Sequence, residues 1–220
     1  MTMRVAVAVS GRGSNLEALL RALGPTAPAR VVLVLSNRAD SGALDRARAH
    51  AVASEVLHDP ADAAEWLARL QRHRIDLLVL AGYVKLVPAA VIARYRERIV
   101  NVHPALLPAF GGPGMYGRRV HDAVLKSGAR LSGVTVHLVD EQYDHGPVLA
   151  QWPVPVRPGD TAESLAERVL AVEHKLLPAV VIACCERLAA GAEPAALALS
   201  SDAFALSTTL PDFRHALAPA

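Results

Sequence analysis

The chain is poor in cysteine, and this shortage excludes two classes of protein. Of its 220 residues only Cys184 and Cys185 are cysteines, and they are adjacent. Neighbouring cysteines rarely bridge each other and no second pair exists, so the sequence excludes a disulfide framework and a cysteine-based metal site. We expect both thiols to fill the interior of a helix as small apolar side chains.

Aromatic residues and excess charge are also scarce. Aromatics make up only 4% of the chain, and the formal net charge is +2. Proteins that bind nucleic acid need clustered arginine and lysine, often beside aromatic surfaces for base stacking, whereas here the basic residues are scattered. The sequence therefore predicts no nucleic-acid partner.

No apolar run is long enough to cross a bilayer, although hydrophobic residues make up 52% of the chain. The longest run, Leu176–Cys185, is shorter than the ~20 residues that a transmembrane helix needs, and Pro178 interrupts it. Residues 5–9 are too few for the apolar core of a signal peptide. We therefore predict a cytoplasmic protein without membrane contact.

Short apolar runs rich in β-branched residues alternate with helical patterns along the chain. We expect strands at 4–9, 30–36, 55–58, 77–80, 99–102, 133–139 and 148–154. We expect helices at 15–23, 42–50, 61–73, 88–94, 120–126 and 161–190. This alternation is typical of an α/β protein with a mostly parallel, twisted sheet, here of about seven strands, and helices on both faces.

A glycine-rich segment at residues 10–15, Ser-Gly-Arg-Gly-Ser-Asn, lies between the first predicted strand and helix. Glycines there let backbone amides approach an anion, and a helix N-terminus adds partial positive charge. We predict that Gly13, Ser14 and Asn15 hold a phosphate; the alternative is a plain glycine-rich connection. The segment lacks the lysine of a nucleoside-triphosphate loop, and Leu16 replaces the third glycine of a dinucleotide fingerprint.

Residues 81–87 follow the fourth predicted strand. Ligands of open parallel sheets sit beyond the carboxyl ends of the strands, so this loop should share a rim with the phosphate loop. Its apolar side chains can wall a flat heterocycle while backbone groups read the edge of the ring. The alternative is a strand that simply runs into a helix begun at Pro88.

The fifth strand ends in Asn101-Val-His-Pro104, and side-chain alternation predicts that Asn101 and His103 project from the same side. An imidazole can move protons, and an amide can donate a hydrogen bond to a developing oxyanion. The carboxylate of Asp144 would favour the imidazolium form. These three groups are what acyl transfer needs. The alternatives are a strand that ends at the surface and, around Asp144, a surface turn.

The histidines outside these motifs carry no recognisable site. We interpret most of them as exposed or hydrogen-bonded structural residues. The spacing of His, Asp, Glu and Cys predicts no zinc site. His145 is expected to face solvent, and His137 to be structural rather than catalytic. The others are His50, His58, His73, His121, His174 and His215.

Four motifs together resemble those of the phosphoribosylglycinamide formyltransferases, a folate-dependent family of purine synthesis. In order they are Ser-Gly-x-Gly-Ser-Asn, Leu-Ala-Gly-Tyr-Val-Lys, Asn-Val-His-Pro-Ala-Leu-Leu-Pro, and Gly-Val-Thr-Val-His-Leu-Val-Asp with a following Asp-x-Gly-Pro. The resemblance runs from about Arg4 to Gly191. It implies a Rossmann-like formyltransferase fold and transfer of a formyl group from 10-formyltetrahydrofolate to the amine of glycinamide ribonucleotide.

The resemblance also implies roles for single residues. The ribonucleotide phosphate would bind at Gly13, Ser14 and Asn15, and Glu173 would contact the same substrate. The catalytic residues would be Asn101, His103 and Asp144. The stretch 140–144 would line the pterin site, and the folate-binding residues would be Tyr83, Val84, Lys85, Leu86, Val87, Asn101 and Asp140.

Several positions depart from the family pattern. Lys85 stands where many relatives have Arg, and Ala63 stands where some have a folate-contacting Arg. The loop Phe110–Tyr116 is longer than in shorter relatives, and the glycine-rich stretch 109–117 around it predicts a mobile, irregular loop. These departures leave the reaction intact and alter the expected contacts to folate.

The chain is expected to form a single formyltransferase domain over residues 1–220. Within it we expect a phosphate-binding half (1–100), a catalytic half (101–191) and a tail (192–220) that adds edge strands or packs loosely. Pro178 should bend the last helix or break it locally. The expected partners are the two small-molecule substrates, with folate as co-substrate and no metal. The sequence leaves the oligomeric state open, a homodimer included.

Related activities are the alternatives. Formyltetrahydrofolate deformylase carries an N-terminal regulatory domain and methionyl-tRNA formyltransferase a C-terminal RNA-binding domain, and we expect neither in this chain. A non-catalytic nucleotide-binding module or an NADP-dependent reductase, with Arg38 at the 2′-phosphate, would leave Asn101, His103 and Asp144 idle.

Overall fold

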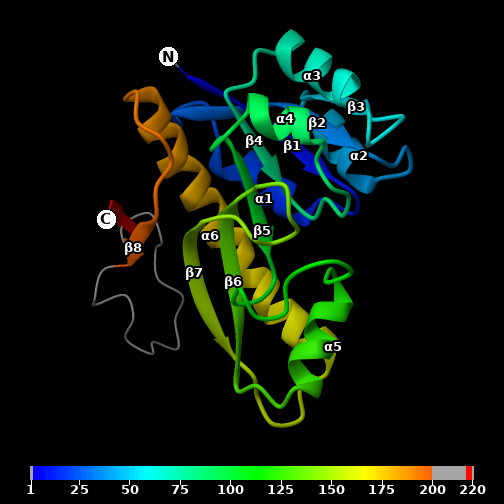
Figure 1. Ribbon diagram of the computed structural model, residues 1–220, viewed down its shortest axis with the longest axis vertical. Helices are drawn as coiled ribbons and strands as arrows, with labels where there is room; N and C mark the ends of the chain where they lie inside the picture. The colour runs from blue at the N-terminus through cyan, green and yellow to red at the C-terminus, as the bar shows by residue number, and fades with distance from the viewer. Residues whose placement is uncertain (1, 200–216, 220) are drawn as a thin grey trace.

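A computed structural model describes residues 2–199 and 217–219 of the chain (Figure 1). The main strands are β1 Met3–Val9, β2 Ala29–Ser36, β3 Ala53–Val56, β4 Leu77–Leu80, β5 Ile99–His103, β6 Leu131–Leu138 and β7 Val148–Pro155. The helices are α1 Ser14–Ala22, α2 Gly42–Ala49, α3 Ala63–Arg72, α4 Ala89–Arg94, α5 Arg118–Lys126 and α6 Ala162–Ala189.

One seven-stranded sheet, in the order β3-β2-β1-β4-β5-β6-β7, forms the centre of the molecule. β1 to β5 pair in parallel, and β6 and β7 add to the β5 edge in antiparallel orientation. β1 and β4 lie in the middle, and residues 5–9 of β1 and all of β4 are apolar and buried, as expected for the centre of a parallel sheet. The predicted fold class is confirmed.

The helices cover both faces of the sheet, as predicted. Apolar residues of α1, α2, α5 and α6 pack in one core, to which α6 contributes Leu176 and α5 contributes Val124. Trp66 of α3 and Val91 of α4 belong to a second core on the opposite face. The long helix α6 runs beside β5, β6 and β7 (Figure 1). Both cysteines are buried in α6, as the sequence predicted.

Helix α6 passes through Pro178 without ending, so of the predicted bend or local break the break is wrong. Proline removes one backbone hydrogen bond and crowds the preceding turn. Residues 176–182 are nevertheless all buried, and packing on both sides holds the helix together across the lost bond. The free energy gained by burying these side chains outweighs the cost of the lost backbone hydrogen bond.

Two further differences concern weakly patterned segments. β3 lies two residues earlier than the predicted 55–58, because this edge strand is only half buried and shows little hydrophobic alternation. In the tail, β8 (Leu197–Leu199) pairs with β9 (Leu217–Pro219) in a separate two-stranded sheet. Residues 200–216 of the predicted tail lie outside the described residues. Among the described residues, no helix has the length and apolar character needed to span a membrane.

The start of α6 is held by a reciprocal pair of hydrogen bonds. The hydroxyl of Thr161 accepts a bond from the Ser164 backbone N–H at 3.2 Å, and the Ser164 hydroxyl accepts one from the Thr161 N–H at 3.0 Å. These bonds satisfy two N–H groups that the helix itself cannot pair.

Replacing the cap should therefore destabilise the whole domain. We expect Thr161→Ala to lower the free energy of unfolding by about 1 kcal/mol, measured by urea denaturation. The control Glu167→Ala changes an exposed position inside the same helix and should shift stability by less than ~0.5 kcal/mol. Equal losses in the two variants would contradict the capping role.

Candidate active site

The loops that follow β1, β4 and β5 meet at one edge of the sheet and line a cavity of about 730 Å³. Parallel strands that neighbour each other end at the same edge, which is why these loops converge. We call this space the central cavity. Of the predicted residues, those that line it are Ser14, Asn15, Tyr83, Val84, Lys85, Asn101, His103, Asp144 and Glu173.

Asn101 and His103 project from the same side of β5 toward one carboxylate. Oδ1 of Asp144 lies 3.4 Å from Nδ2 of Asn101 and 3.4 Å from Nδ1 of His103. The amide, the imidazole and the carboxylate thus form a single cluster at the cavity wall. The side chain of His103 is only 3% exposed, which strengthens its electrostatic interaction with the carboxylate.

The second nitrogen of His103 faces the glycine-rich loop. Nε2 lies 2.9 Å from the carbonyl oxygen of Phe110. A carbonyl can only accept a hydrogen bond, so Nε2 carries a proton in this arrangement. Nδ1 then faces the carboxylate of Asp144. Both nitrogens point at acceptors, and this geometry suits the doubly protonated imidazolium.

The carboxylate of Asp144 is held by groups from three segments. Its Oδ2 accepts a hydrogen bond of 2.9 Å from the backbone N–H of Gly112. Burial acts to raise the pKa of Asp144, but the hydrogen bond and charge of His103 and the hydrogen bond from Gly112 outweigh it, and the pKa lies below its usual value. Asp144 is therefore ionised throughout the neutral range.

His137 belongs to this cluster, although the sequence predicted a structural role for it. Antiparallel pairing of β5 with β6 sets His137 opposite Asn101. Its Nδ1–H donates to the Leu138 carbonyl at 2.7 Å, which leaves Nε2 free to accept from the Asn101 amide at 3.0 Å. His137 is thus hydrogen-bonded, as expected, and also orients Asn101. No signal within the β6 sequence indicates this, because the strand pairing decides it.

The loop between Ala109 and Gly117 contains neither helix nor strand, in agreement with its glycine content. It nevertheless supplies the carbonyl of Phe110 to His103 and the N–H of Gly112 to Asp144. A side chain at Gly111 would put its Cβ 2.5 Å from Leu107 and 3.1 Å from Cβ of Asp144. Glycine at 111 therefore allows the loop to approach the carboxylate this closely.

The predicted phosphate loop is built around Gly13, whose φ of +77° places it in the left-handed region. A Cβ there would also lie 2.6 Å from that of Ala43 in α2, so only glycine fits. Ser14 begins α1 and lines the central cavity, whereas Gly13 does not. The N-terminus of α1 therefore opens toward the cavity with its unpaired backbone amides.

Asn15 connects this loop to α6. Its Nδ2 donates a hydrogen bond of 2.5 Å to Oε2 of Glu173, although the two residues lie far apart in the sequence. Burial raises the pKa of Glu173, and the bond from Asn15 and the charge of His103 only partly offset this effect. Glu173 therefore faces the cavity as a buried carboxyl group beside the phosphate loop.

The residues predicted to bind folate divide into two groups. Tyr83, Val84 and Lys85 line the central cavity. Leu86 is 46% exposed and Val87 is buried in the core on the α3–α4 face, and neither lines the cavity. Tyr83 packs edge-on against Trp66 with 5.5 Å between ring centroids, which fixes the base of this wall.

Asp140 does not line the central cavity. Its Oδ2 lies 2.7 Å from Nδ1 of His145, and hydrogen bonding to His145 and to the Gln142 backbone lowers the pKa of Asp140 against the opposing effect of burial. His145 is largely exposed, as predicted. The described residues contain no group of three or more His, Cys, Asp or Glu side chains with metal-binding geometry.

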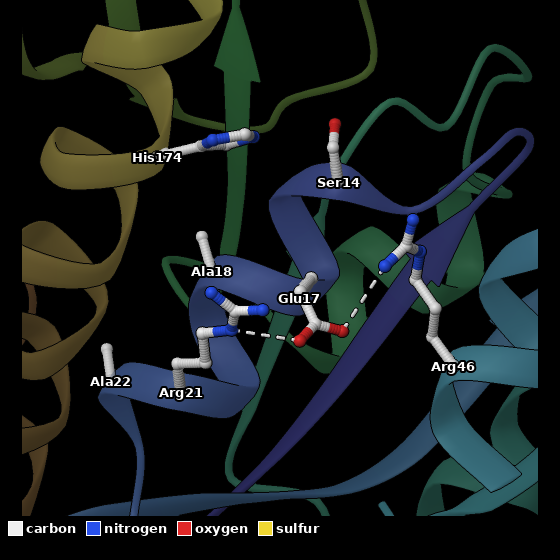
Figure 2. A pocket seen from close by; sticks show the side chains of 7 residues that line it. All are labelled: Ser14, Glu17, Ala18, Arg21, Ala22, Arg46 and His174. Carbon is white, nitrogen blue, oxygen red and sulfur yellow. Dashed lines mark hydrogen bonds and ion pairs between the residues drawn. The ribbon is translucent and has the colours of Figure 1, made fainter. Parts of the chain in front are cut away.

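A second hollow of about 590 Å³ lies outside the phosphate loop and shares only Ser14 with the central cavity. Figure 2 shows Glu17 between two guanidinium groups, with Oε1 2.9 Å from Nε of Arg21 and Oε2 3.4 Å from Nη1 of Arg46. His174 lies across the hollow on α6. The charged side chains of this hollow form ion pairs with one another, so they are not free to act on a substrate. We therefore assign the chemistry to the central cavity.

The fold and the cavity define an α/β protein with an acyl-transfer arrangement at the ends of its strands. The formyl transferase family matches residues 3–181. The chain belongs to this family.

The names of individual relatives are more specific than the name of the family. A phosphoribosylglycinamide formyltransferase of Escherichia coli K12 is 36% identical over 186 residues, covering 81% of this chain and 85% of that protein. A chloroplastic protein of the same name from Arabidopsis thaliana is 44% identical over 191 residues, covering 83% of this chain. The match spans 65% of that plant protein and 61% of its counterpart in Vigna unguiculata.

Solved structures agree with the fold. The phosphoribosylglycinamide formyltransferase of Brucella melitensis is 44% identical, covers 84% of this chain and 96% of its own, and superposes with a TM-score of 0.76. That of Anaplasma phagocytophilum is 33% identical, with coverage of 92% and 91% and a TM-score of 0.78.

The lowered pKa of Asp144 predicts a specific pH dependence of stability. A carboxyl group whose pKa is lower when folded contributes stability above its unfolded pKa of about 3.9, and loses it as the pH falls through the folded value. We expect Asp144→Asn to be less stable than the parent by about 1–3 kcal/mol at pH 6. The difference should shrink below about pH 4.

Urea denaturation of both proteins between pH 3 and pH 7 measures this difference. Asparagine is the suitable replacement because Asp144 has a φ of +55°, which asparagine tolerates well. A stability difference that stays constant over the whole range would show that the charge of Asp144 makes no contribution.

Proposed function

We propose that the chain transfers a formyl group from 10-formyltetrahydrofolate to the amine of glycinamide ribonucleotide in purine biosynthesis. One observation carries the proposal: the phosphate loop, the Tyr83–Lys85 wall and the Asn101–His103–Asp144 cluster all line the same cavity. Two substrates can therefore meet beside groups suited to acyl transfer. The names of the relatives point to the same reaction.

The reaction begins when the substrate amine attacks the formyl carbon and creates a tetrahedral oxyanion. Asn101 donates a hydrogen bond to this oxygen, and the imidazolium of His103 stabilises its charge. Proton transfer from the attacking amine to the folate nitrogen then lets the folate leave, with Nε2 of His103 as the proton carrier once it exchanges the Phe110 carbonyl for the substrate. Asp144 orients His103, and His137 orients Asn101.

The substrates occupy opposite sides of this cluster. The ribonucleotide phosphate binds at Gly13, Ser14 and Asn15, where the backbone amides of α1 are unpaired, and Glu173 contacts the same substrate. Folate binds along the Tyr83–Val87 loop and the 140–144 turn, where Tyr83, Val84 and Lys85 line the cavity. The absence of a metal, the cytoplasmic location and a homodimer stay predictions.

Removing either polarising group should reduce turnover strongly. We expect Asn101→Ala and His103→Ala each to lower kcat by about 10²–10³, because each loses a group that acts on the developing charge. Formyl transfer is measured with purified protein at saturating concentrations of both substrates. Unchanged thermal unfolding is the control for folding, and near-normal turnover of His103→Ala would contradict the assigned role.

The identity of the acceptor is tested by leaving it out. We expect consumption of 10-formyltetrahydrofolate to depend on added glycinamide ribonucleotide and to continue in EDTA. Formate release without the ribonucleotide would instead indicate a hydrolase. Binding of NADP with no effect of folate on thermal unfolding would indicate the reductase alternative.

A further inference from the structure

His121 is a buried histidine that the mechanism above does not use. It lies in the first turn of α5, directly after the glycine-rich loop, and it is 4% exposed. Its side chain lines the central cavity and makes no hydrogen bond to any described residue. Its Nδ1 is enclosed by protein, so Nε2 is the nitrogen left to meet a ligand.

The environment of His121 keeps the ring neutral. Burial lowers the pKa of His121, the charge of Asp122 acts in the opposite direction, and the charge of His103 lowers the pKa further. A neutral imidazole offers one donor and one acceptor without adding a second positive charge beside His103. It is therefore suited to hydrogen-bond an uncharged polar group of a substrate.

The position of α5 indicates which substrate that is. α5 and α6 pack against each other, and α6 also packs against α1, which begins at the phosphate loop. His121, Glu173 and Asn15 thus all come from helices on one face of the sheet. Tyr83 and Val87, from the proposed folate wall, belong to the core on the opposite face. His121 lies on the ribonucleotide side.

A second buried histidine, His174, serves as a comparison for His121. It also carries an enclosed nitrogen without a hydrogen-bond partner among the described residues, and burial lowers its pKa as well. It lines the second hollow, outside the phosphate loop, instead of the central cavity (Figure 2). Of these two neutral histidines, only His121 shares a cavity with Asn101 and His103.

We propose that His121 is a further substrate-binding residue, whose Nε2 hydrogen-bonds a hydroxyl or amide group of the ribonucleotide. The proposal rests on the proposed function, which supplies the ribonucleotide. It assigns to His121 a contact in the bound ground state and no part in moving the proton, which belongs to His103.

Steady-state kinetics with the full chain test this assignment. In His121→Phe the ring volume is kept and the hydrogen bond is lost, and we expect the KM for glycinamide ribonucleotide to rise about tenfold. The KM for 10-formyltetrahydrofolate and kcat should change less than about twofold. His121→Gln, whose amide overlays Nε2, should restore most of the affinity, whereas His121→Asn, whose amide overlays Nδ1, should not.

Calorimetric titration of the ribonucleotide into each variant gives the same comparison without turnover, and His58→Phe is the control at an exposed histidine outside the cavity. An unchanged ribonucleotide KM in His121→Phe, or a rise in the folate KM alone, would overturn the assignment. A purely structural role would affect both substrates, and Gln and Asn would then behave alike. If the unmodified chain neither binds nor formylates the ribonucleotide, the proposed function itself fails and this assignment with it.

Discussion

The site depends on one buried carboxylate, that of Asp144. It lies against the imidazole of His103 and the amide of Asn101, and it takes a backbone hydrogen bond from Gly112. An ionised group that is mostly shielded from water acts strongly on its neighbours, because little solvent screens it. Asn101 and His103 come from β5, and Gly112 comes from the loop that follows this strand. The carboxylate therefore decides how these segments are arranged around the reacting carbon.

The sheet makes this arrangement possible because its strands change from parallel to antiparallel pairing at β5. The parallel strands β1, β4 and β5 bring the phosphate loop, the Tyr83–Lys85 wall and Asn101 to one edge. β6 then pairs with β5 in antiparallel orientation and sets His137 opposite Asn101. On the outer side, the bond from Asn15 to Glu173 joins the phosphate loop to α6. Both halves of the cavity are thus fixed by the same fold.

The sequence was sufficient for the fold class and for the grouping of Asn101, His103 and Asp144. Apolar runs such as 31–35 and 77–80 indicate strands buried on both faces, and side-chain alternation placed Asn101 and His103 on one side. The role of His137 could not be predicted, because it depends on which strand lies beside β5. Nor could the contacts of Phe110 and Gly112, since these are made by backbone atoms. At Pro178 the local sequence predicted a bend or break in the helix, and the packing around the residue keeps α6 continuous.

The central claim is that His103 and Asp144 act as one unit, and a double-mutant cycle on kcat tests it most directly. Turnover is measured for His103→Ala, Asp144→Asn and the double variant, with folding checked by thermal denaturation. Because Asp144 acts through His103, the double variant should be no slower than the slower single variant, within about threefold. A double variant slowed by the product of the two single effects would show that the two residues act independently, and would contradict the account.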